Sequence, residues 1–308
     1  MKTIDIVVPC YNEELCVKPL YNAVNDVMRQ ESGYETSILF VDDGSRDGTI
    51  EQVKELKEEN VKVKYMSFSR NFGKEAAIFA GLVNSTGDIV VLMDADLQHP
   101  PELLPQMLRE LENGYDCCGA RRVDRKGEPP IRSIFSRQFY SLMKKATGLE
   151  LVQGGSDFRA MKRIVVDAVV AMPEKERFTK GILSWVGFDI KWLEYENVER
   201  KYGQTKWSFL GLIKYAMNGF FSFSTFPLRM AVYLGFFIDV IAVLYAVLTL
   251  VSVVTTDAPR TGYATIVLLL LFFGGTIILI LGIVGEYIAR LYYEVKNRPV
   301  YIVKEKKL

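Results

Sequence analysis

Histidine and cysteine are scarce in this chain of 308 residues, which contains one histidine and four cysteines. No two cysteines have the Cys-x-x-Cys spacing, and the single His99 cannot complete a zinc site with them. A basic excess is also missing, because 38 Lys and Arg stand against 37 Asp and Glu. The composition therefore favours reduced, buried thiols in a cytosolic domain, and it gives no support for a zinc site or a nucleic-acid partner.

Charge is scarce in the last third of the chain. Up to about residue 206 charged residues occur every few positions, but residues 230–254 contain one charge and residues 265–285 contain none. A helix of this length crosses the roughly 30 Å of hydrocarbon in a bilayer, and a soluble core helix rarely runs so long without charge. We therefore expect transmembrane helices at 230–254 and 263–288.

The segments around these spans complete the predicted organisation. Residues 289–308 form a tail rich in Lys and Arg, so the positive-inside rule places this tail and a domain at 1–206 in the cytoplasm. Residues 207–229 are aromatic and basic, which suits an amphipathic segment at the bilayer interface, although a buried connecting helix would also fit. Asp239 is costly in lipid and is expected to face another helix or a second subunit. We expect an integral membrane protein that forms a tetramer or a dimer.

The first half of the chain alternates between strand-like and helix-like segments. The expected strands are 3–9, 36–43, 61–68 and 88–94, and the expected helices are 14–30, 47–60, 73–85 and 100–114. Alternation of this kind indicates an α/β fold whose mostly parallel sheet is covered by helices on both faces. Ligands of such sheets bind beyond the carboxyl ends of the strands.

Three of the expected strands end in polar clusters. These clusters read "PCYNE" at 9–13, "VDDGSRDGT" at 41–49 and "MDADLQH" at 93–99. Because the carboxyl ends of parallel strands lie at one edge of a sheet, the three loops are expected to form a single site.

The third cluster contains two carboxylates, Asp94 and Asp96, at the end of an apolar strand. Residues two apart in a strand point the same way, so both carboxylates are expected to face one point. Oxygen ligands without Cys or His suit Mg²⁺ or Mn²⁺, which completes its shell with water and substrate phosphate. A solvated loop after a strand is the alternative interpretation. His99, which follows in the loop, is assigned no catalytic role.

The second cluster begins with the pair Asp42 and Asp43. Carboxylates at this point of a nucleotide-binding sheet commonly accept hydrogen bonds from a ribose or a base. Asp-Gly-Ser is also ordinary turn chemistry. The position of the pair beside the other two loops favours nucleotide binding.

Seven motifs occur in order over about 200 residues of the chain. They are "VPCYNE", "VDDGSRDGT", "RNFGKEAAIFAGL", "DADLQHPPE", "GGSDFRAM", "RFTKGILSWVGF" and "RKYGQTKWS". Together with the two apolar segments, they resemble family 2 glycosyltransferases of the polyprenyl-phosphate branch, such as dolichol-phosphate mannose synthases and bacterial undecaprenyl-phosphate glucosyltransferases. The resemblance covers essentially the whole chain.

The resemblance implies a GT-A fold, a bacterial cytoplasmic membrane location and a metal-dependent hexosyltransferase that inverts the sugar's configuration. The implied reaction moves a hexose from a nucleotide sugar, with UDP-glucose or a related UDP-sugar favoured, to undecaprenyl or polyprenyl phosphate. By this resemblance, the residues that bind the donor are Pro9, Tyr11, Glu13, Asp42, Asp43, Lys74, Gln98, Arg200 and Lys206. The catalytic carboxylates are Asp94, Asp96 and Asp157, with Mg²⁺ or Mn²⁺ on the first two, and the acceptor phosphate is held by Arg121, Arg132 and Ser136.

The charges of the reaction agree with these roles. Negative charge develops on the leaving diphosphate, where a divalent cation, Arg200 and Lys206 would stabilise it. The acceptor is a phosphate monoester that is mostly ionised at neutral pH, so Asp157 is expected to orient groups or tune charge rather than abstract a proton.

Two other functions fit the sequence less well. A processive polysaccharide synthase would carry a Gln-x-x-Arg-Trp motif, which the sequence lacks, and would need more than two spans for a pore. A membrane protein that binds nucleotide sugars without catalysis would not need Asp94, Asp96 and Asp157 together.

Overall fold

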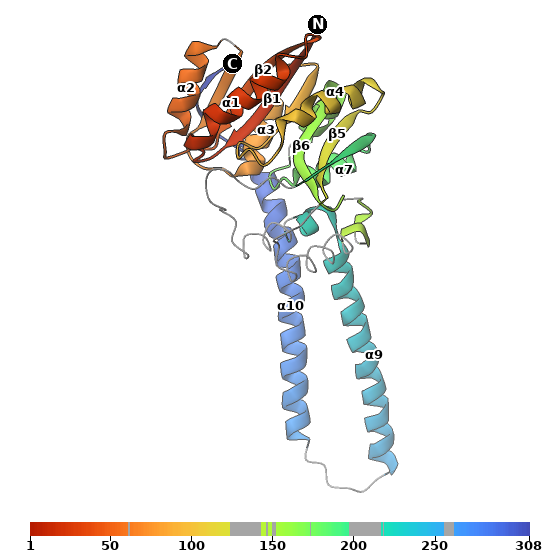
Figure 1. The fold of residues 1–308 in the computed structure, drawn as a ribbon. Coiled ribbons are helices and arrows are strands. Elements are labelled where there is room, and N and C mark those ends of the chain that lie inside the picture. Colours follow the sequence, from red (N-terminus) through yellow and green to blue (C-terminus); the bar gives the residue numbers. More distant parts are fainter. Residues whose placement is uncertain are drawn as a thin grey trace. The chain divides into compact units, whose positions relative to one another are not determined.

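The computed structural model describes residues 1–60, 62–123, 143–145, 147–149, 152–172, 174–196, 217, 219–255 and 262–308. The chain forms two compact units (Figure 1). The first contains Met1–Gly219 together with Pro299–Leu308, and the second contains Phe220–Arg298. The C-terminal residues thus belong to the same unit as the N-terminus.

The first unit is built around one sheet. Its strands are β1 (Lys2–Cys10), β2 (Tyr34–Asp42), β3 (Val63–Phe68), β4 (Ile89–Leu92), β5 (Cys117–Arg122), β6 (Gly155–Lys162), β7 (Ile190–Tyr195) and β8 (Val303–Lys307). Its helices are α1 (Glu14–Met28), α2 (Thr49–Glu59), α3 (Lys74–Asn84), the 3₁₀ turn η1 (Pro101–Leu103), α4 (Leu104–Glu112), α6 (Arg163–Val170) and α7 (Thr179–Trp185).

The strand order is β7-β5-β6-β4-β1-β2-β3-β8. The central strands β4, β1, β2 and β3 are parallel, whereas β6 and β8 run antiparallel to their neighbours β4 and β3. The order reverses at β1, because the chain builds β2 and β3 on one side of it and then returns to place β4 on the other. Such a switch point leaves a crevice beyond the carboxyl ends of β1 and β4, where α/β sheets bind ligands.

Helices cover both faces of the sheet. Ile6 of β1 shares a buried cluster with residues of α1, α2 and α4, such as Val17, Val53 and Leu104. Val7 points to the opposite face, where α3 packs so closely that a Cβ on Gly81 would lie 2.1 Å from the Val7 Cγ1. Glycine is therefore required at this contact, and α3 approaches β1 more closely than any larger residue at position 81 would permit.

The second unit contains two long apolar helices, α9 (Phe226–Thr255) and α10 (Tyr263–Lys296). Each has a stretch long and apolar enough to cross a membrane, Phe226–Tyr245 in α9 and Phe272–Lys296 in α10. The Tyr287 hydroxyl of α10 donates a hydrogen bond of 2.6 Å to the carbonyl of Ser224, and the Arg290 guanidinium lies over the Phe221 ring. These contacts fix α10 to the residues that precede α9.

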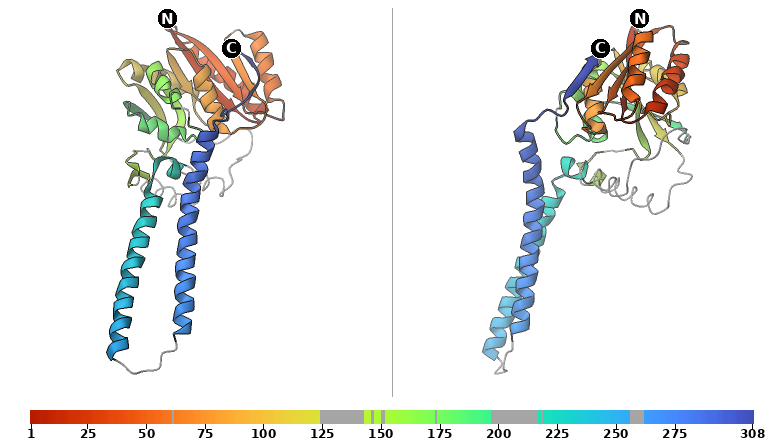
Figure 2. Two further views of the ribbon diagram at one scale, coloured as in Figure 1. Left: turned by 180° about the vertical axis from the view of Figure 1, so that it is seen from behind. Right: turned by 90° about the vertical axis from the view of Figure 1, so that its left-hand side faces the viewer.

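The α/β fold class predicted from the sequence is confirmed, and the predicted strands and helices of the first half are all present. Residues 289–308 have more regular structure than the tail predicted there. The predicted tail at 289–308 contains the end of α10, which continues to Lys296, and the strand β8, which joins the sheet (Figure 2). Lysines are common on edge strands because they discourage pairing with other chains, so a strand reading VKEKK resembles a solvated tail in the sequence.

Candidate active site

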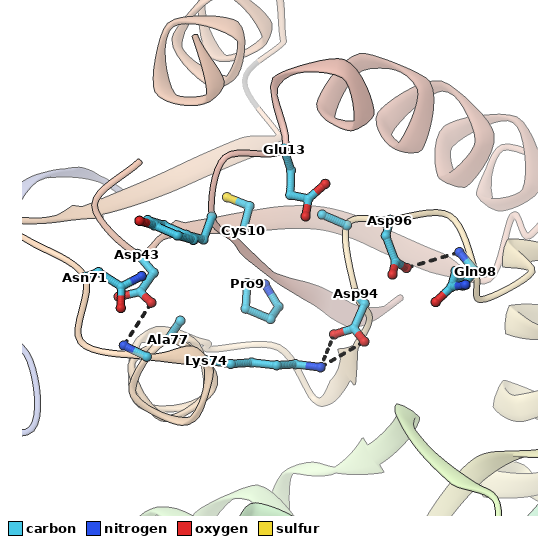
Figure 3. Close-up of a pocket in the computed structure, with 13 residues that line it drawn as sticks. Pro9, Cys10, Glu13, Asp43, Asn71, Lys74, Ala77, Asp94, Asp96 and Gln98 are labelled. Carbon is cyan, nitrogen blue, oxygen red and sulfur yellow. Dashed lines mark hydrogen bonds and ion pairs between the residues drawn. The ribbon is translucent and has the colours of Figure 1, made fainter. Parts of the chain in front are cut away.

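A cavity of 410 Å³ lies at the switch point of the sheet, beyond the ends of β1 and β4 (Figure 3). Its wall is built by the loops after β1, β2, β3 and β4 and by the start of α3. The lining residues are Pro9, Cys10, Tyr11, Glu13, Asp43, Asn71, Gly73, Lys74, Ala77, Asp94, Ala95, Asp96 and Gln98. The three polar clusters of the sequence thus meet in one site.

The loops after β1 and β2 are tied together by hydrogen bonds. Asn12, which has a positive φ of 52°, accepts a bond from the Arg46 backbone at 2.8 Å, and its own backbone N–H donates to the Ser45 hydroxyl at 2.8 Å. The Glu13 backbone N–H donates to the Thr49 hydroxyl at 2.8 Å. These bonds tie residues 12 and 13 to the loop that follows the aspartate pair.

The aspartate pair at the end of β2 faces in two directions. Asp42 accepts hydrogen bonds from the Ser67 hydroxyl at 2.7 Å and the Ser45 backbone at 3.0 Å, and it is almost fully buried. Asp43 accepts bonds from the backbone N–H groups of Phe72 at 2.6 Å and Gly73 at 2.9 Å. Burial raises the pKa of Asp43 to about 6, with a smaller contribution from Asp42, although the two backbone bonds oppose this shift.

The turn after the pair requires glycine at position 44. Gly44 has a φ of +68°, and a Cβ there would lie 2.5 Å from the backbone carbon of Arg70. The β2–α2 loop therefore lies directly against the segment that follows β3. This close approach joins the second and third parallel strands at the edge where the site is built.

Asp94 and Asp96 lie in a turn rather than in a strand, because β4 ends at Leu92. Strand alternation therefore does not aim the two carboxylates at one point, which corrects the reason given from the sequence. The turn contains Leu97 at a φ of 57°, and the Gln98 backbone N–H donates to Asp96 at 3.2 Å. Both aspartates still line the cavity, with Asp94 facing Lys74 and Asp96 facing Gln98 (Figure 3).

The buried His99 side chain is hydrogen-bonded to the backbone of this turn. The imidazole stacks on Phe158 with ring centroids 5.3 Å apart, and its Nδ1 accepts a hydrogen bond of 3.4 Å from the Asp94 backbone. The side chain is only 2% exposed, and burial lowers the pKa of His99. The neutral ring therefore holds the backbone of Asp94 and does not face the cavity.

Lys74 links Asp94 to Asp157. The Lys74 ammonium lies 2.7 Å from an oxygen of Asp94 and 2.7 Å from an oxygen of Asp157, which lies on β6. Lys180 at the start of α7 lies 3.7 Å from the other Asp157 oxygen and donates to the Gly155 carbonyl at 3.1 Å. Burial alone would raise the pKa of Asp157, but Lys180 and Lys74 hold it well below its usual value. Burial would lower the pKa of Lys74, yet Asp157 and Asp94 keep it above its usual value.

The donor set at Asp94 and Asp96 suits a divalent cation that shares its shell with substrate phosphate. In the described part of the chain, no group of three or more His, Cys, Asp or Glu side chains could hold a metal by protein ligands alone. Two carboxylates are enough for Mg²⁺ or Mn²⁺ when water and phosphate oxygens fill the other positions. The Lys74 ammonium is paired with the Asp94 carboxylate in this structure, so a metal ion that binds Asp94 requires the ammonium to move.

The structure brings most of the predicted donor residues together. Pro9, Tyr11, Glu13, Asp43, Lys74, Asp94, Asp96 and Gln98 line the cavity, and Asp42 lines a smaller neighbouring one. Arg121 lies on β5, 4.0 Å from Glu194, and is not among the residues that line the cavity. The predictions for Arg132, Ser136, Arg200 and Lys206 concern residues outside the described part of the chain.

The structure also adds residues that sequence reasoning did not single out. Asn71 and Ala77 line the cavity, and Lys180 contacts Asp157. Both Asn71 and Lys180 belong to quoted motifs, "RNFGKEAAIFAGL" and "RFTKGILSWVGF". The motifs thus marked the right segments, but only the fold shows which of their side chains reach the site.

Comparison with known proteins identifies the family of the chain. Residues 5–170 match Glycosyl transferase family 2, and residues 226–291 match the GtrB C-terminal hairpin. The chain is 45% identical over 302 residues to the CsbB protein of Bacillus subtilis, a glycosyltransferase by name, covering 98% of this chain and 91% of that protein. It is 39% identical over 302 residues to the SfII prophage-derived bactoprenol glucosyl transferase of Shigella flexneri, covering 98% of this chain and 97% of that protein.

Among solved structures, the glucosyl-3-phosphoglycerate synthase of Mycobacterium tuberculosis aligns over 70% of this chain and 76% of its own, with a TM-score of 0.48 and 18% identity. That similarity is too distant to transfer ligands. The matched family region covers more than half of the chain, and the relatives match nearly its full length. The chain therefore belongs to glycosyltransferase family 2 and is a glycosyltransferase.

Proposed function

We propose that this glycosyltransferase transfers a hexose from a nucleotide sugar to a polyprenyl phosphate such as undecaprenyl phosphate, with inversion at the sugar carbon. The favoured donor is UDP-glucose or a related UDP-sugar. The observation that carries the proposal is the Asp94–Lys74–Asp157 chain of ion pairs, which joins the carboxylate motif of a donor site to a second carboxylate on β6. The relatives named as bactoprenol glucosyl transferases support the acceptor and the sugar.

The donor half of the site suits a sugar diphosphate. A divalent cation, Mg²⁺ or Mn²⁺, at Asp94 and Asp96 would neutralise the negative charge that develops on the leaving diphosphate. Asp43 lies across the cavity with its carboxylate fixed by two backbone N–H groups, and it is placed to accept a hydrogen bond from a ribose or base. The cavity therefore has an anion-binding end and a hydroxyl-binding end.

The acceptor half needs little base catalysis. A phosphate monoester has a second pKa near 6 and is mostly ionised at neutral pH, so its oxygen attacks without losing a proton. Asp157 has its oxygens occupied by Lys74 and Lys180 and a pKa well below the usual range, which makes it a poor proton acceptor. We assign Asp157 to positioning the two lysines, whose charges then favour the anionic acceptor.

The apolar helices supply the route to a lipid substrate. We propose the division into a cytoplasmic catalytic domain at 1–206, an interfacial segment at 207–229, spans at 230–254 and 263–288, and a cytoplasmic end at 289–308. Both proposed spans lie within helices long and apolar enough to cross a bilayer. A protein with these spans would sit in the bacterial cytoplasmic membrane, where its polyprenyl acceptor is anchored, and we propose that it assembles as a dimer or a tetramer. The side chain of Asp239, expected to face another helix or a second subunit, lies outside the described part of the structure.

The test is transfer of radiolabelled glucose from UDP-glucose to undecaprenyl phosphate by the purified full chain with Mg²⁺. The expected product is organic-soluble and labile to mild acid. Asp94→Asn should lower the rate by at least about 100-fold, as expected for loss of a group that acts on the leaving diphosphate. Binding of UDP-glucose without any labelled lipid, in the presence of acceptor and metal, would contradict the proposal.

A further inference from the structure

A second cavity of 270 Å³ adjoins the first and shares Tyr11 and Asn71 with it. Its walls come from the β2–α2 loop, from the end of β3 and from β8. The charged residues that line it are Asp42, Arg46, Arg70, Lys304 and Glu305. Two of these five side chains belong to the C-terminal strand, which lies outside both of the regions matched to known families.

The strand β8 carries a bulge at this cavity. Its pairing with β3 joins Ser67 to Glu305 and then Phe68 to Val303, so Lys304 has no partner residue in β3. Bulges of this kind redirect a side chain, and they are frequent beside active sites. The residue that the bulge inserts is the one that contributes a cation to the cavity wall.

The bulge lies on firmly held backbone. On one side of Lys304, the Ser69 N–H donates to the Ile302 carbonyl at 2.9 Å, and the Tyr301 ring stacks on Phe68 with centroids 5.0 Å apart. On the other side, Glu305 forms an ion pair of 2.7 Å with Lys54. Lys304 is thus carried by a fixed strand rather than by a loose terminus.

The second cavity offers several positively charged hydrogen-bond donors. Arg46, Arg70 and Lys304 contribute three positive charges, and the Glu305 charge is balanced by Lys54. The Asp42 carboxylate accepts a hydrogen bond from Ser67, and Ser67 is the β3 residue that pairs with Glu305. The strand β8 therefore lies next to the residue that holds Asp42 in place. Tyr11, between the two cavities, offers an aromatic face on which a planar heterocycle can stack.

We propose that the C-terminal strand completes the donor site, and that Lys304 donates a hydrogen bond to the nucleoside of the donor nucleotide. This inference rests on the proposed function, because the first cavity would hold the sugar diphosphate at Asp94 and Asp96 and the ribose beside Asp43, while the second takes the base. The end of the chain, reached only after both long helices, thereby takes part in substrate recognition in the first unit.

The test compares UDP binding to the purified full chain and to two variants on the same strand by titration calorimetry. Lys304→Ala should weaken UDP binding by about tenfold, the usual effect of losing a hydrogen bond from a charged donor. Lys306→Ala is the matched control, because Lys306 is also an exposed lysine of β8 but does not line the cavity, and its affinity for UDP should be unchanged. In Lys304→Ala, the affinity for UMP should fall by the same factor as the affinity for UDP. Inorganic pyrophosphate, which lacks a nucleoside, should bind both variants as tightly as it binds the parent.

Three results would overturn the inference. They are unchanged UDP affinity in Lys304→Ala, an equal loss in Lys306→Ala, and a loss for pyrophosphate as large as that for UDP. In each case glucose transfer by the parent chain would be intact, so the proposed function would survive. A parent chain that binds no UDP and transfers no glucose would instead defeat the proposed function.

Discussion

At the scale of single residues, Asp43 makes stability depend on pH. Its native pKa of about 6 lies above the ordinary value of 3.8, so between these pH values the folded protein holds a proton that the unfolded chain has released. Folding stability should therefore fall as pH rises from about 4 to about 6 and then stay level. Two pKa units correspond to roughly 3 kcal/mol of unfolding free energy.

The variant Asp43→Asn should remove this dependence, because asparagine does not titrate. We expect the melting temperature of the variant minus that of the parent to be larger at pH 7.5 than at pH 4.5, as measured by scanning fluorimetry in detergent. Asp26→Asn is the control, since Asp26 is exposed on α1 and its substitution should leave the pH profile unchanged. A constant difference between Asp43→Asn and the parent across this range would show that Asp43 does not titrate in it.

Lys74 competes with a metal ion for Asp94. Its ammonium lies 2.7 Å from an Asp94 oxygen, so a cation must displace it, and affinity for metal should be weak until a diphosphate supplies further ligands. Lys74→Met should bind Mn²⁺ several-fold more tightly than the parent in the absence of nucleotide, measured by electron paramagnetic resonance of free Mn²⁺. Lys180→Met is the matched control, because Lys180 contacts Asp157 but not Asp94. Equal Mn²⁺ affinity in the parent and in Lys74→Met would refute the competition.

The donor motifs could be found from the sequence because parallel strands deliver their carboxyl ends to one edge. Asp43, Asp94 and Asp96 follow directly from that rule. The Lys74–Asp157 ion pair could not be found this way, since it joins residues 83 positions apart, one on α3, which packs against β1 and β2, and the other on β6. Side-chain partners across such distances depend on register and on helix rotation, which periodicity does not report.

At the scale of elements, the contact between α3 and β1 depends on a glycine at position 81. Gly81→Ala would gain up to about 1 kcal/mol of helix propensity, but its Cβ would lie 2.1 Å from the Val7 Cγ1, inside a fully buried layer. Overpacking of this kind typically costs about 1–3 kcal/mol of folding stability, which exceeds the gain in helix propensity. The melting temperature should therefore fall. The double variant Val7→Ala/Gly81→Ala should lose less stability than the sum of the single variants, because each change makes room for the other. Strict additivity of the three melting shifts would count against this packing.

The elements themselves were predictable where they had strong periodicity and clear ends. Residues 100–114, with proline at the start and glycine at the end, contain η1 and α4, and Gly114 has a φ of 114°. The strand β8 was not predictable, because a segment of alternating Lys and Glu with one valine buries almost nothing and is fixed by pairing with β3 and by the Tyr301–Phe68 stack. The formation of this strand depends on its pairing with β3, and the strand propensity of the local sequence does not predict it.

At the scale of the whole molecule, β8 constrains the topology of the chain. Residues 303–307 pair with β3 in the same sheet as the N-terminal strand, although α9 and α10 lie between them in the sequence. A chain that leaves a folded unit and returns to it must cross a membrane an even number of times. If α9 crosses, α10 must therefore cross back, and the connection between them must lie on the side opposite both termini.

Single cysteines can test this topology, because all four native cysteines are buried and should give little background with an impermeant maleimide. Thr255→Cys places a thiol at the exposed end of α9, and Leu308→Cys places one at the exposed C-terminus. In intact spheroplasts the reagent should label Thr255→Cys and leave Leu308→Cys unmodified, and inverted membrane vesicles should give the reverse pattern. Solubilised protein, in which both positions are accessible, serves as the control for reactivity. Labelling of both positions from the same side of a sealed membrane would mean that α9 and α10 do not cross it, and the lipid acceptor would then have to reach the site from the membrane surface.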